Sequence, residues 1–130
     1  MSHSIRGRAG NAATDEEMIA NNKKAIEVGT YVENNCPDLR IYVPGRMDKF
    51  LIDQGVTPIK VVDALLGLDC AIVGQSDILL VYIPDDYISG GMRIEIKHAL
   101  CIEKDIIYFS DVSPETIKHL NTCINKLKEN

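Results

Sequence analysis

The segment Asp77–Ile83 reads Asp-Ile-Leu-Leu-Val-Tyr-Ile and is almost continuously apolar. A strand with one wet face alternates apolar and polar residues, whereas a strand covered on both faces does not. Helical patterns precede and follow this segment, which favours a parallel sheet with helices on both sides. We therefore expect one α/β domain over residues 1–130. Its expected architecture is a three-layer sandwich with a small, mainly parallel sheet of four to five strands, flavodoxin- or Rossmann-like.

The other expected elements follow from caps, breakers and apolar spacing. Thr14 with Glu17 three positions later forms a capping box that begins a helix. Residues 14–35 are expected to form a helix, and residues 46–55 a broken helix or a lid closed by Gly55. Another helix is expected to begin at Thr57-Pro58, with an interruption at Gly67. A helix of about three turns is expected to follow Ser89-Gly90-Gly91, and a last helix is expected to begin at Ser113-Pro114. Two further strands are expected at Leu39–Val43 and, buried, at Asp105–Phe109.

Charge and composition exclude several classes of function. The net charge is −5 and no basic stripe is visible, which disfavours a polymeric nucleic acid as partner. No apolar run is long enough to span a membrane, and residues 1–6 lack the apolar stretch of a secretory signal, so we expect a cytoplasmic protein without membrane contact. The four cysteines show no Cys-x-x-Cys spacing, and we expect no metal, no redox cofactor and buried, reduced thiols.

Parallel sheets bind ligands at the carboxyl ends of their strands. That rule selects the loops after the N-terminal stub, after Val43, after Ile83 and after Phe109. The first loop contains Ser4-Ile5-Arg6-Gly7-Arg8-Ala9-Gly10, in which glycines and arginines suit a phosphate, although a solvated surface turn has the same composition. The third loop ends at Ser89, which is either a plain N-cap or a ligand for a phosphate or sugar hydroxyl.

Two carboxylates are candidates for chemistry. Glu95 lies in the first turns of the expected helix, bracketed by apolar residues, and partial desolvation would raise its pKa and suit a nucleophile or base. The alternative is a plain ion pair with Lys97 or Arg93, or a glutamate favoured by the helix N-terminus. Asp69 either caps a helical turn or points into the same cleft as Glu95. Two carboxylates at one site permit acid/base catalysis or double displacement at an anomeric carbon.

At these residues the chain resembles the nucleoside 2-deoxyribosyltransferase superfamily. The resemblance is strongest in Asp69-(x)7-Asp77-Ile-Leu-Leu-Val-Tyr-Ile-Pro-(x)4-Ser89-Gly-Gly-Met-Arg-Ile-Glu95-Ile-Lys-His-Ala99. Ser4-Ile5-Arg6-Gly7 is similar to the phosphate-binding turn of the 2′-deoxynucleoside 5′-monophosphate N-glycosidase branch. Ser89 is also similar to that branch, because the nucleoside transferases tend to carry an Asp there.

The resemblance implies a role for each matching residue. Glu95 would attack the anomeric carbon, Asp69 would help to protonate the leaving base, and water or a second base would accept the sugar. The implied ligands of substrate or phosphate are Ser4, Ile5, Arg6, Gly7, Ser89 and Gly91. The resemblance also implies a small nucleoside or nucleotide as ligand and a homo-oligomer whose subunits complete each other's sites.

Two other functions stay open. One is a catalytically silent protein that binds or sequesters nucleotides on the same scaffold. The other is a nucleoside monophosphate phosphoribohydrolase of the type marked by Pro-Gly-Gly-x-Gly-Thr-x-x-Glu, which Gly90-Gly91 and Glu95 echo in part.

Overall fold

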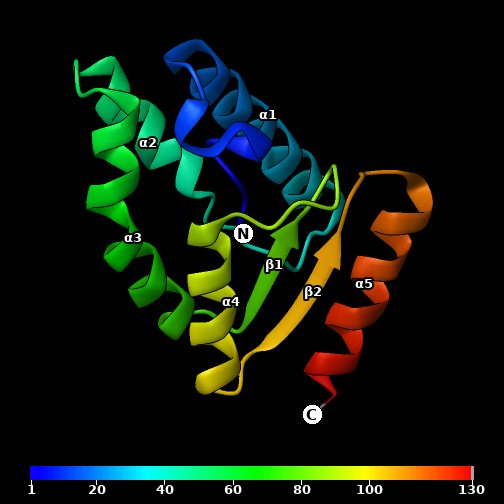
Figure 1. Cartoon of the computed structure of the whole chain (residues 1–130). Helices are drawn as coiled ribbons and strands as arrows, with labels where there is room; N and C mark the ends of the chain where they lie inside the picture. Colours follow the sequence, from blue (N-terminus) through cyan, green and yellow to red (C-terminus); the bar gives the residue numbers. More distant parts are fainter. Residues whose placement is uncertain (130) are drawn as a thin grey trace.

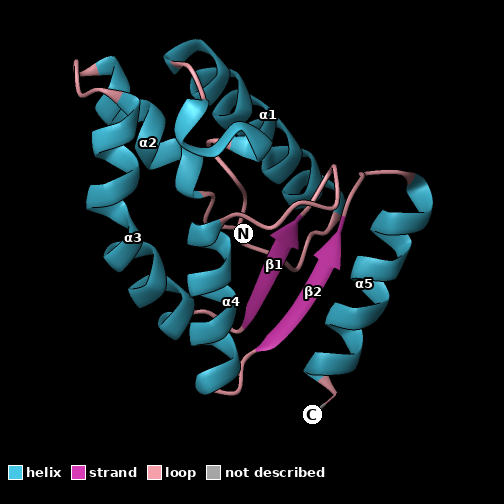
Figure 2. Cartoon of the chain, in the orientation of Figure 1, coloured by secondary structure: helices cyan, strands magenta, loops and turns pink. Residues whose placement is uncertain are grey.

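The computed structural model describes residues 1–129, apart from the side chains of residues 59 and 62–64. Within these residues, a short 3₁₀ helix and three α-helices precede the first strand, and strands and helices alternate from there on (Figures 1 and 2). In chain order the elements are η1 (Gly7–Ala12), α1 (Asp15–Asn35), α2 (Pro44–Asp53), α3 (Pro58–Gln75), β1 (Ile78–Tyr82), α4 (Gly90–Cys101), β2 (Asp105–Phe109) and α5 (Pro114–Lys128). Over the described part of the chain, no helix has both the length and the apolar content that crossing a membrane requires.

The sheet is small and parallel. β1 pairs with β2 in parallel, and Ile78 lies opposite Asp105. On the other edge of β1, Ser2 forms an isolated parallel bridge with Val81. The Ser2 amide donates to the Leu80 carbonyl at 2.6 Å, and the Tyr82 amide donates to the Ser2 carbonyl at 2.9 Å. The N-terminal residues are thereby held beside β1, and the turn that follows them lies beyond its carboxyl end (Figure 1).

Helices cover both faces of this sheet, as the apolar sequence of β1 predicts. On one face, Leu80, Tyr82, Ile107 and Phe109 belong to a core with α1 and α5. On the other face, Leu79 and Val81 pack with Val73 of α3 and with Met92 and Ala99 of α4. The α/β class is therefore correct, and α3 and α4 share one side of the sheet.

The expectation of four to five strands is wrong for residues 1–129, where the sheet has two. Leu39–Val43 is extended but forms no strand. Its backbone groups find other partners: the Ile41 amide donates to the Glu33 carboxylate at 2.8 Å, the Arg46 guanidinium donates to the Ile41 carbonyl at 3.1 Å, and the α-amino group of Met1 donates to the Tyr42 carbonyl at 2.7 Å. Side chains and the chain end thus replace the ladder that a strand would need.

Three smaller expectations also need correction. Residues 46–55 are not a broken helix, because α2 is continuous and begins at Pro44, the first helical position that proline favours. Gly67 does not interrupt α3, since a single glycine weakens a helix without breaking it. β2 is only partly buried, because it is the last strand of the sheet and Tyr108 stays 47 % exposed. The helix expected after Thr14 is confirmed as α1, and its buried residues include Met18, Ala25, Val28 and Val32.

Two helical glycines should respond in opposite ways to alanine. A Cβ at Gly29 would overlap the Val43 Cγ2 methyl, so Gly29→Ala should cost about 1–3 kcal/mol of unfolding free energy through overpacking. A Cβ at Gly67 would meet nothing within 4 Å, so Gly67→Ala should add up to about 1 kcal/mol through helix propensity. Urea denaturation of both variants measures the difference. A stable Gly29→Ala protein would contradict the close approach of α1 to the 39–43 segment.

Candidate functional site

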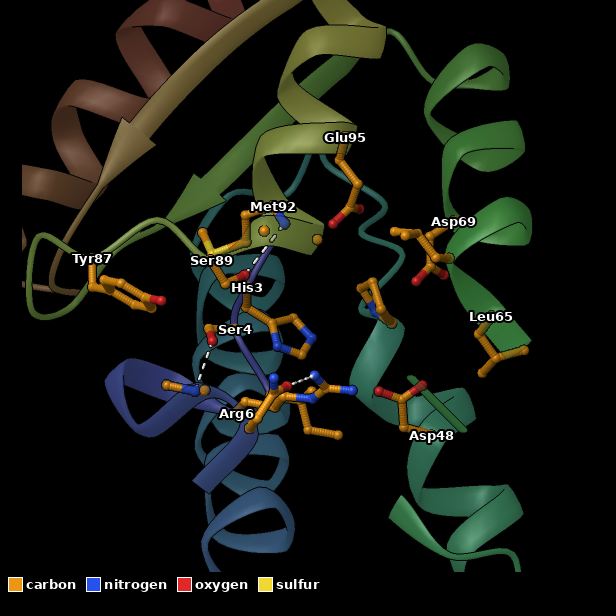
Figure 3. A pocket seen from close by; sticks show the side chains of 18 residues that line it. His3, Ser4, Arg6, Asp48, Leu65, Asp69, Tyr87, Ser89, Met92 and Glu95 are labelled. Atoms are coloured by element: carbon orange, nitrogen blue, oxygen red, sulfur yellow. Dashed lines mark hydrogen bonds between the residues drawn. The ribbon is translucent and has the colours of Figure 1, made fainter. Parts of the chain in front are cut away.

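A cleft of about 410 Å³ lies beyond the carboxyl end of β1 (Figure 3). The N-terminal turn, α2, α3, the loop after β1 and the first turns of α4 line it. Its volume is within the range of small-molecule sites. The structure brings the sequence-predicted site residues around this one cavity: Ser4, Ile5, Arg6, Gly7, Asp69, Ser89, Gly91 and Glu95.

Glu95 reaches this cleft from the buried face of α4. Met92 and Ala99 pack on the sheet at positions three before and four after it, so the helical repeat turns Glu95 the same way. Its side chain is 6 % exposed, and the Ser2 hydroxyl donates to its Oε1 at 3.1 Å. No ion pair joins it to Lys97 or Arg93 within residues 1–129. The plain ion pair considered from the sequence is therefore not present.

The pKa of Glu95 is raised to about 7, mainly because burial disfavours the ionised form. The negative charge of Asp69 raises this pKa further. The hydrogen bond from Ser2 and the positive charge of the Met1 α-amino group act in the opposite direction but do not cancel the effect of burial. Glu95 is therefore a carboxyl group that exchanges its proton near neutral pH.

Asp69 projects from the middle of α3 toward the same space (Figure 3). It does not cap a helix, because α3 continues to Gln75. Burial raises the pKa of Asp69 to about 6, while the Tyr42 hydroxyl, which donates to its Oδ1 at 3.4 Å, lowers this pKa. Because α3 packs beside α4, two carboxyl groups from separate segments share one cavity.

The N-terminal turn is shaped by short polar contacts. The Gly7 amide donates to the Ser4 hydroxyl at 2.8 Å, and the Asn21 side chain of α1 donates to the Ile5 carbonyl at 2.8 Å. Gly7 has a φ of 63°, which glycine adopts without a steric penalty. The Ile5 side chain itself is buried. Arg6 extends toward the α2 side of the cleft and donates to Asn11 Oδ1 at 2.8 Å, so its guanidinium is not gathered with Ser89 (Figure 3).

Ser89 is the N-cap of α4. Its hydroxyl accepts a hydrogen bond from the Met92 amide at 3.3 Å. The N-cap interpretation is therefore confirmed, and Ser89 also lines the cleft with Gly90 and Gly91. A Cβ added at Gly90 would meet nothing within 4 Å. The positive end of the α4 helix dipole thus opens into the cavity, where an anion would be favoured.

Sequence reasoning did not single out four polar residues that line the cleft: His3, Asn11, Asp48 and Tyr87. His3 Nε2 accepts a hydrogen bond from the Gly45 amide at 3.1 Å and so ties the N-terminal segment to the start of α2. Burial lowers the pKa of His3 to about 4, so the ring is neutral at pH 7. Asp48 is 6 % exposed on α2. No motif marks it, and only its place in a helix near a selected loop could have drawn attention to it.

The loops selected from the sequence contribute unequally to the lining of the cleft. The turn after the N-terminal stub and the loop after β1 line the cleft, and the segment after Val43 contributes through α2. No described residue of the loop after Phe109 lines it. Arg8 instead links the first and third loops: it stacks 5.3 Å from the centre of the Tyr87 ring and pairs with Asp85 at 3.3 Å.

Comparisons of the chain with models of known protein families, with curated proteins and with solved structures give no match. Any functional statement therefore depends on the site itself and on the resemblance of its motifs.

Replacing Glu95 by glutamine should stabilise the protein at high pH. The folded pKa of about 7 lies above the value of 4.5 for a free glutamate, so the stabilising effect of the protonated form is complete below about pH 4 and lost as pH rises through 7. Glutamine mimics the protonated form and keeps an oxygen for Ser2. We expect Glu95→Gln to add about 2–3 kcal/mol to the unfolding free energy at pH 8 and under about 1 kcal/mol at pH 5.

Urea denaturation at the two pH values measures this difference. Glu27→Gln, an exposed change on α1, is the control and should alter stability little at either pH. An equal effect of Glu95→Gln at both pH values would show that the carboxylate is not desolvated.

Proposed function

We propose that this chain cleaves or transfers at the N-glycosidic bond of a 2′-deoxynucleoside or its 5′-monophosphate. The observation that carries the proposal is the meeting of Glu95 and Asp69 in one cleft with an open helix N-terminus on its rim. Both carboxyl groups have raised pKa values. The motif resemblance to the nucleoside 2-deoxyribosyltransferase superfamily supports the same chemistry. The open N-terminus of α4 at Ser89, which suits a phosphate, favours the monophosphate as substrate.

The proposed reaction is a double displacement. The Glu95 carboxylate attacks C1′ and forms a glycosyl-enzyme ester, while the electron pair of the C1′–N bond goes to the base and Asp69 gives it a proton. Water then attacks C1′, Asp69 takes the proton from this water, and Glu95 leaves as a carboxylate. In a transferase, the nitrogen of a second base replaces water. The atoms balance without a metal or redox cofactor.

This reaction requires one proton on the carboxyl pair, with Glu95 ionised and Asp69 protonated. The pair loses its protons near pH 6 and pH 7, so the singly protonated form is most abundant between these values. We expect kcat/KM for base release from deoxynucleoside monophosphates to be bell-shaped, with its maximum between pH 6 and 7. Glu95→Gln should abolish release, and chromatography of the free base measures it.

Asp69→Asn is the matched test of the second carboxyl group. It should lower kcat by about 10²–10⁴-fold and remove the alkaline limb of the profile. It should not move the acid limb to lower pH, because on that limb Asp69 is protonated and, like the asparagine that replaces it, carries no charge. Base release that survives Glu95→Gln would overturn the proposal, and a preference for ribonucleotides would favour the phosphoribohydrolase alternative.

Ser89 should distinguish phosphorylated from unphosphorylated substrates. Ser89→Asp keeps an N-cap but places a negative charge at the helix N-terminus, so it should raise KM for the monophosphate at least tenfold and change KM for the nucleoside little. Ser113→Asp is the matched control, because it makes the same change at the N-cap of α5, where Ser113 accepts from the Thr116 amide at 3.3 Å, away from the cleft. Equal losses on both substrates would contradict a phosphate at Ser89.

A catalytically silent nucleotide-binding protein is the second candidate, and one observation favours it. The pKa of Glu95 is about 7 and that of Asp69 is about 6, so in the unliganded protein the proposed nucleophile holds its proton more tightly than the proposed acid. A bound phosphate and sugar would have to reverse this order. Tight nucleotide binding without base release would establish this second function.

The proposal also covers the layer arrangement of the fold and the oligomeric state of the protein. Helices on both faces of the sheet support the flavodoxin-like three-layer arrangement that the resemblance implies. We also infer a homo-oligomer in the cytoplasm. The exposed apolar side chains of Ile94 and Leu100 on α4, 49 % and 63 % accessible, support an interface there. A molar mass of one chain by light scattering would contradict the oligomer.

A further inference from the structure

The proposed reaction leaves one buried carboxyl group of the cleft without a role. Asp48 lies in the second turn of α2 and is 6 % exposed. Burial raises the pKa of Asp48 to about 6, and the charge of Asp69 raises it further. An ionisable group in such a place costs stability unless a partner compensates for its desolvation.

The surroundings of Asp48 offer little compensation. The amide of Asn22 lies near enough to favour the ionised form, but no hydrogen bond of good geometry reaches the carboxylate from the described residues. Asn22 is itself 2 % exposed, and neither of its side-chain polar atoms has a partner there. A buried carboxylate with unfilled acceptor positions, directed into a cavity, is suited to a ligand that brings donors.

The position of Asp48 in the cleft indicates which part of a nucleotide would lie beside it. In Figure 3 its carboxylate points into the cleft on the same side as Asp69 and Leu65, across from Ser89 and Ser4. Pro44, Leu65 and Leu66 form the neighbouring wall. If the phosphate lies at Ser89 and the anomeric carbon at Glu95, this apolar wall is left for the flat base, whose hydrogen-bonding edge would meet Asp48.

We propose that Asp48 reads the edge of the nucleobase and selects a base with a ring N–H beside an exocyclic amino group, as in guanine. This inference rests on the proposed function, because it takes the cleft to hold a nucleotide. An ionised carboxylate only accepts hydrogen bonds, and its two oxygens match two parallel N–H donors. Adenine and cytosine place a ring-nitrogen acceptor beside their amino group, and thymine flanks its N–H with carbonyl oxygens. With each of these three bases, a hydrogen-bond acceptor of the base would face a carboxylate oxygen, which is also an acceptor.

The test compares two nucleotides that differ by one amino group. Calorimetry near pH 8, where Asp48 is ionised, measures binding of dGMP and dIMP to Glu95→Gln protein, which should not turn them over. We expect dGMP to bind roughly tenfold more tightly, because dIMP lacks the exocyclic amino group. In the Glu95→Gln/Asp48→Asn double variant the two affinities should agree within about twofold, because the amide replaces one acceptor oxygen by a donor.

Asp53→Asn is the matched control on the same helix. Asp53 is exposed and pairs with Lys49 at 2.7 Å, so its replacement should leave the ratio of affinities unchanged. Equal binding of dGMP and dIMP, no binding of either, or a ratio that survives Asp48→Asn would overturn the inference. The equal-binding result does not require a folded Asp48 variant. Base release by the unaltered protein is measured in a separate experiment. If that protein releases no base, the ratio of the affinities for dGMP and dIMP still decides the role of Asp48.

Discussion

The burial of Glu95 is the constraint on which the site depends. α4 can cover the sheet only by turning Met92 and Ala99 inward, and the helical repeat then carries Glu95 inward with them. The carboxyl group is therefore nearly buried and faces the cleft instead of the outer surface of α4. Its nearest donor, the Ser2 hydroxyl, belongs to the segment that bridges to β1. Ser2 thus bridges to the sheet edge with its backbone and holds the proposed nucleophile with its hydroxyl.

The rest of the cleft is assembled by short contacts between elements far apart in the chain. His3 accepts from the Gly45 amide and so fixes the start of α2, which carries Asp48. Tyr42 donates to Asp69 from the extended segment between α1 and α2. Glu95 and Asp69 are therefore each oriented by a segment other than their own helix, and the helix that carries Asp48 is held in place by His3. Preorganisation of this kind is what a site needs if its groups must hold their positions while charge develops.

Local sequence patterns predicted much of the fold but only part of the candidate site. The start of α1 after Thr14, the extent of β2 and the N-caps Ser89 and Ser113 follow from local residue preferences, and the structure agrees. Leu39–Val43 has the composition of a strand, but the side chains of Glu33 and Arg46 form hydrogen bonds with its backbone. Competition from side chains outside the segment cannot be read from the spacing of residues within it. The sequence did not predict Asp48 as a site residue, because its burial depends on how α2 packs between α1 and α3.

The three carboxyl groups of the cleft are difficult to explain by folding alone. Each of Glu95, Asp69 and Asp48 has a raised pKa, so the folded chain pays a desolvation cost for each of them at neutral pH. A glutamine at 95 would keep the contact with Ser2 without that cost, and an apolar residue at 48 would match the wall made by Leu65 and Leu66. A stable fold needs none of these charges. Their convergence on one cavity is the reason to propose a ligand or a reaction that uses them, since groups whose pKa values are shifted by burial and by each other cluster at functional sites.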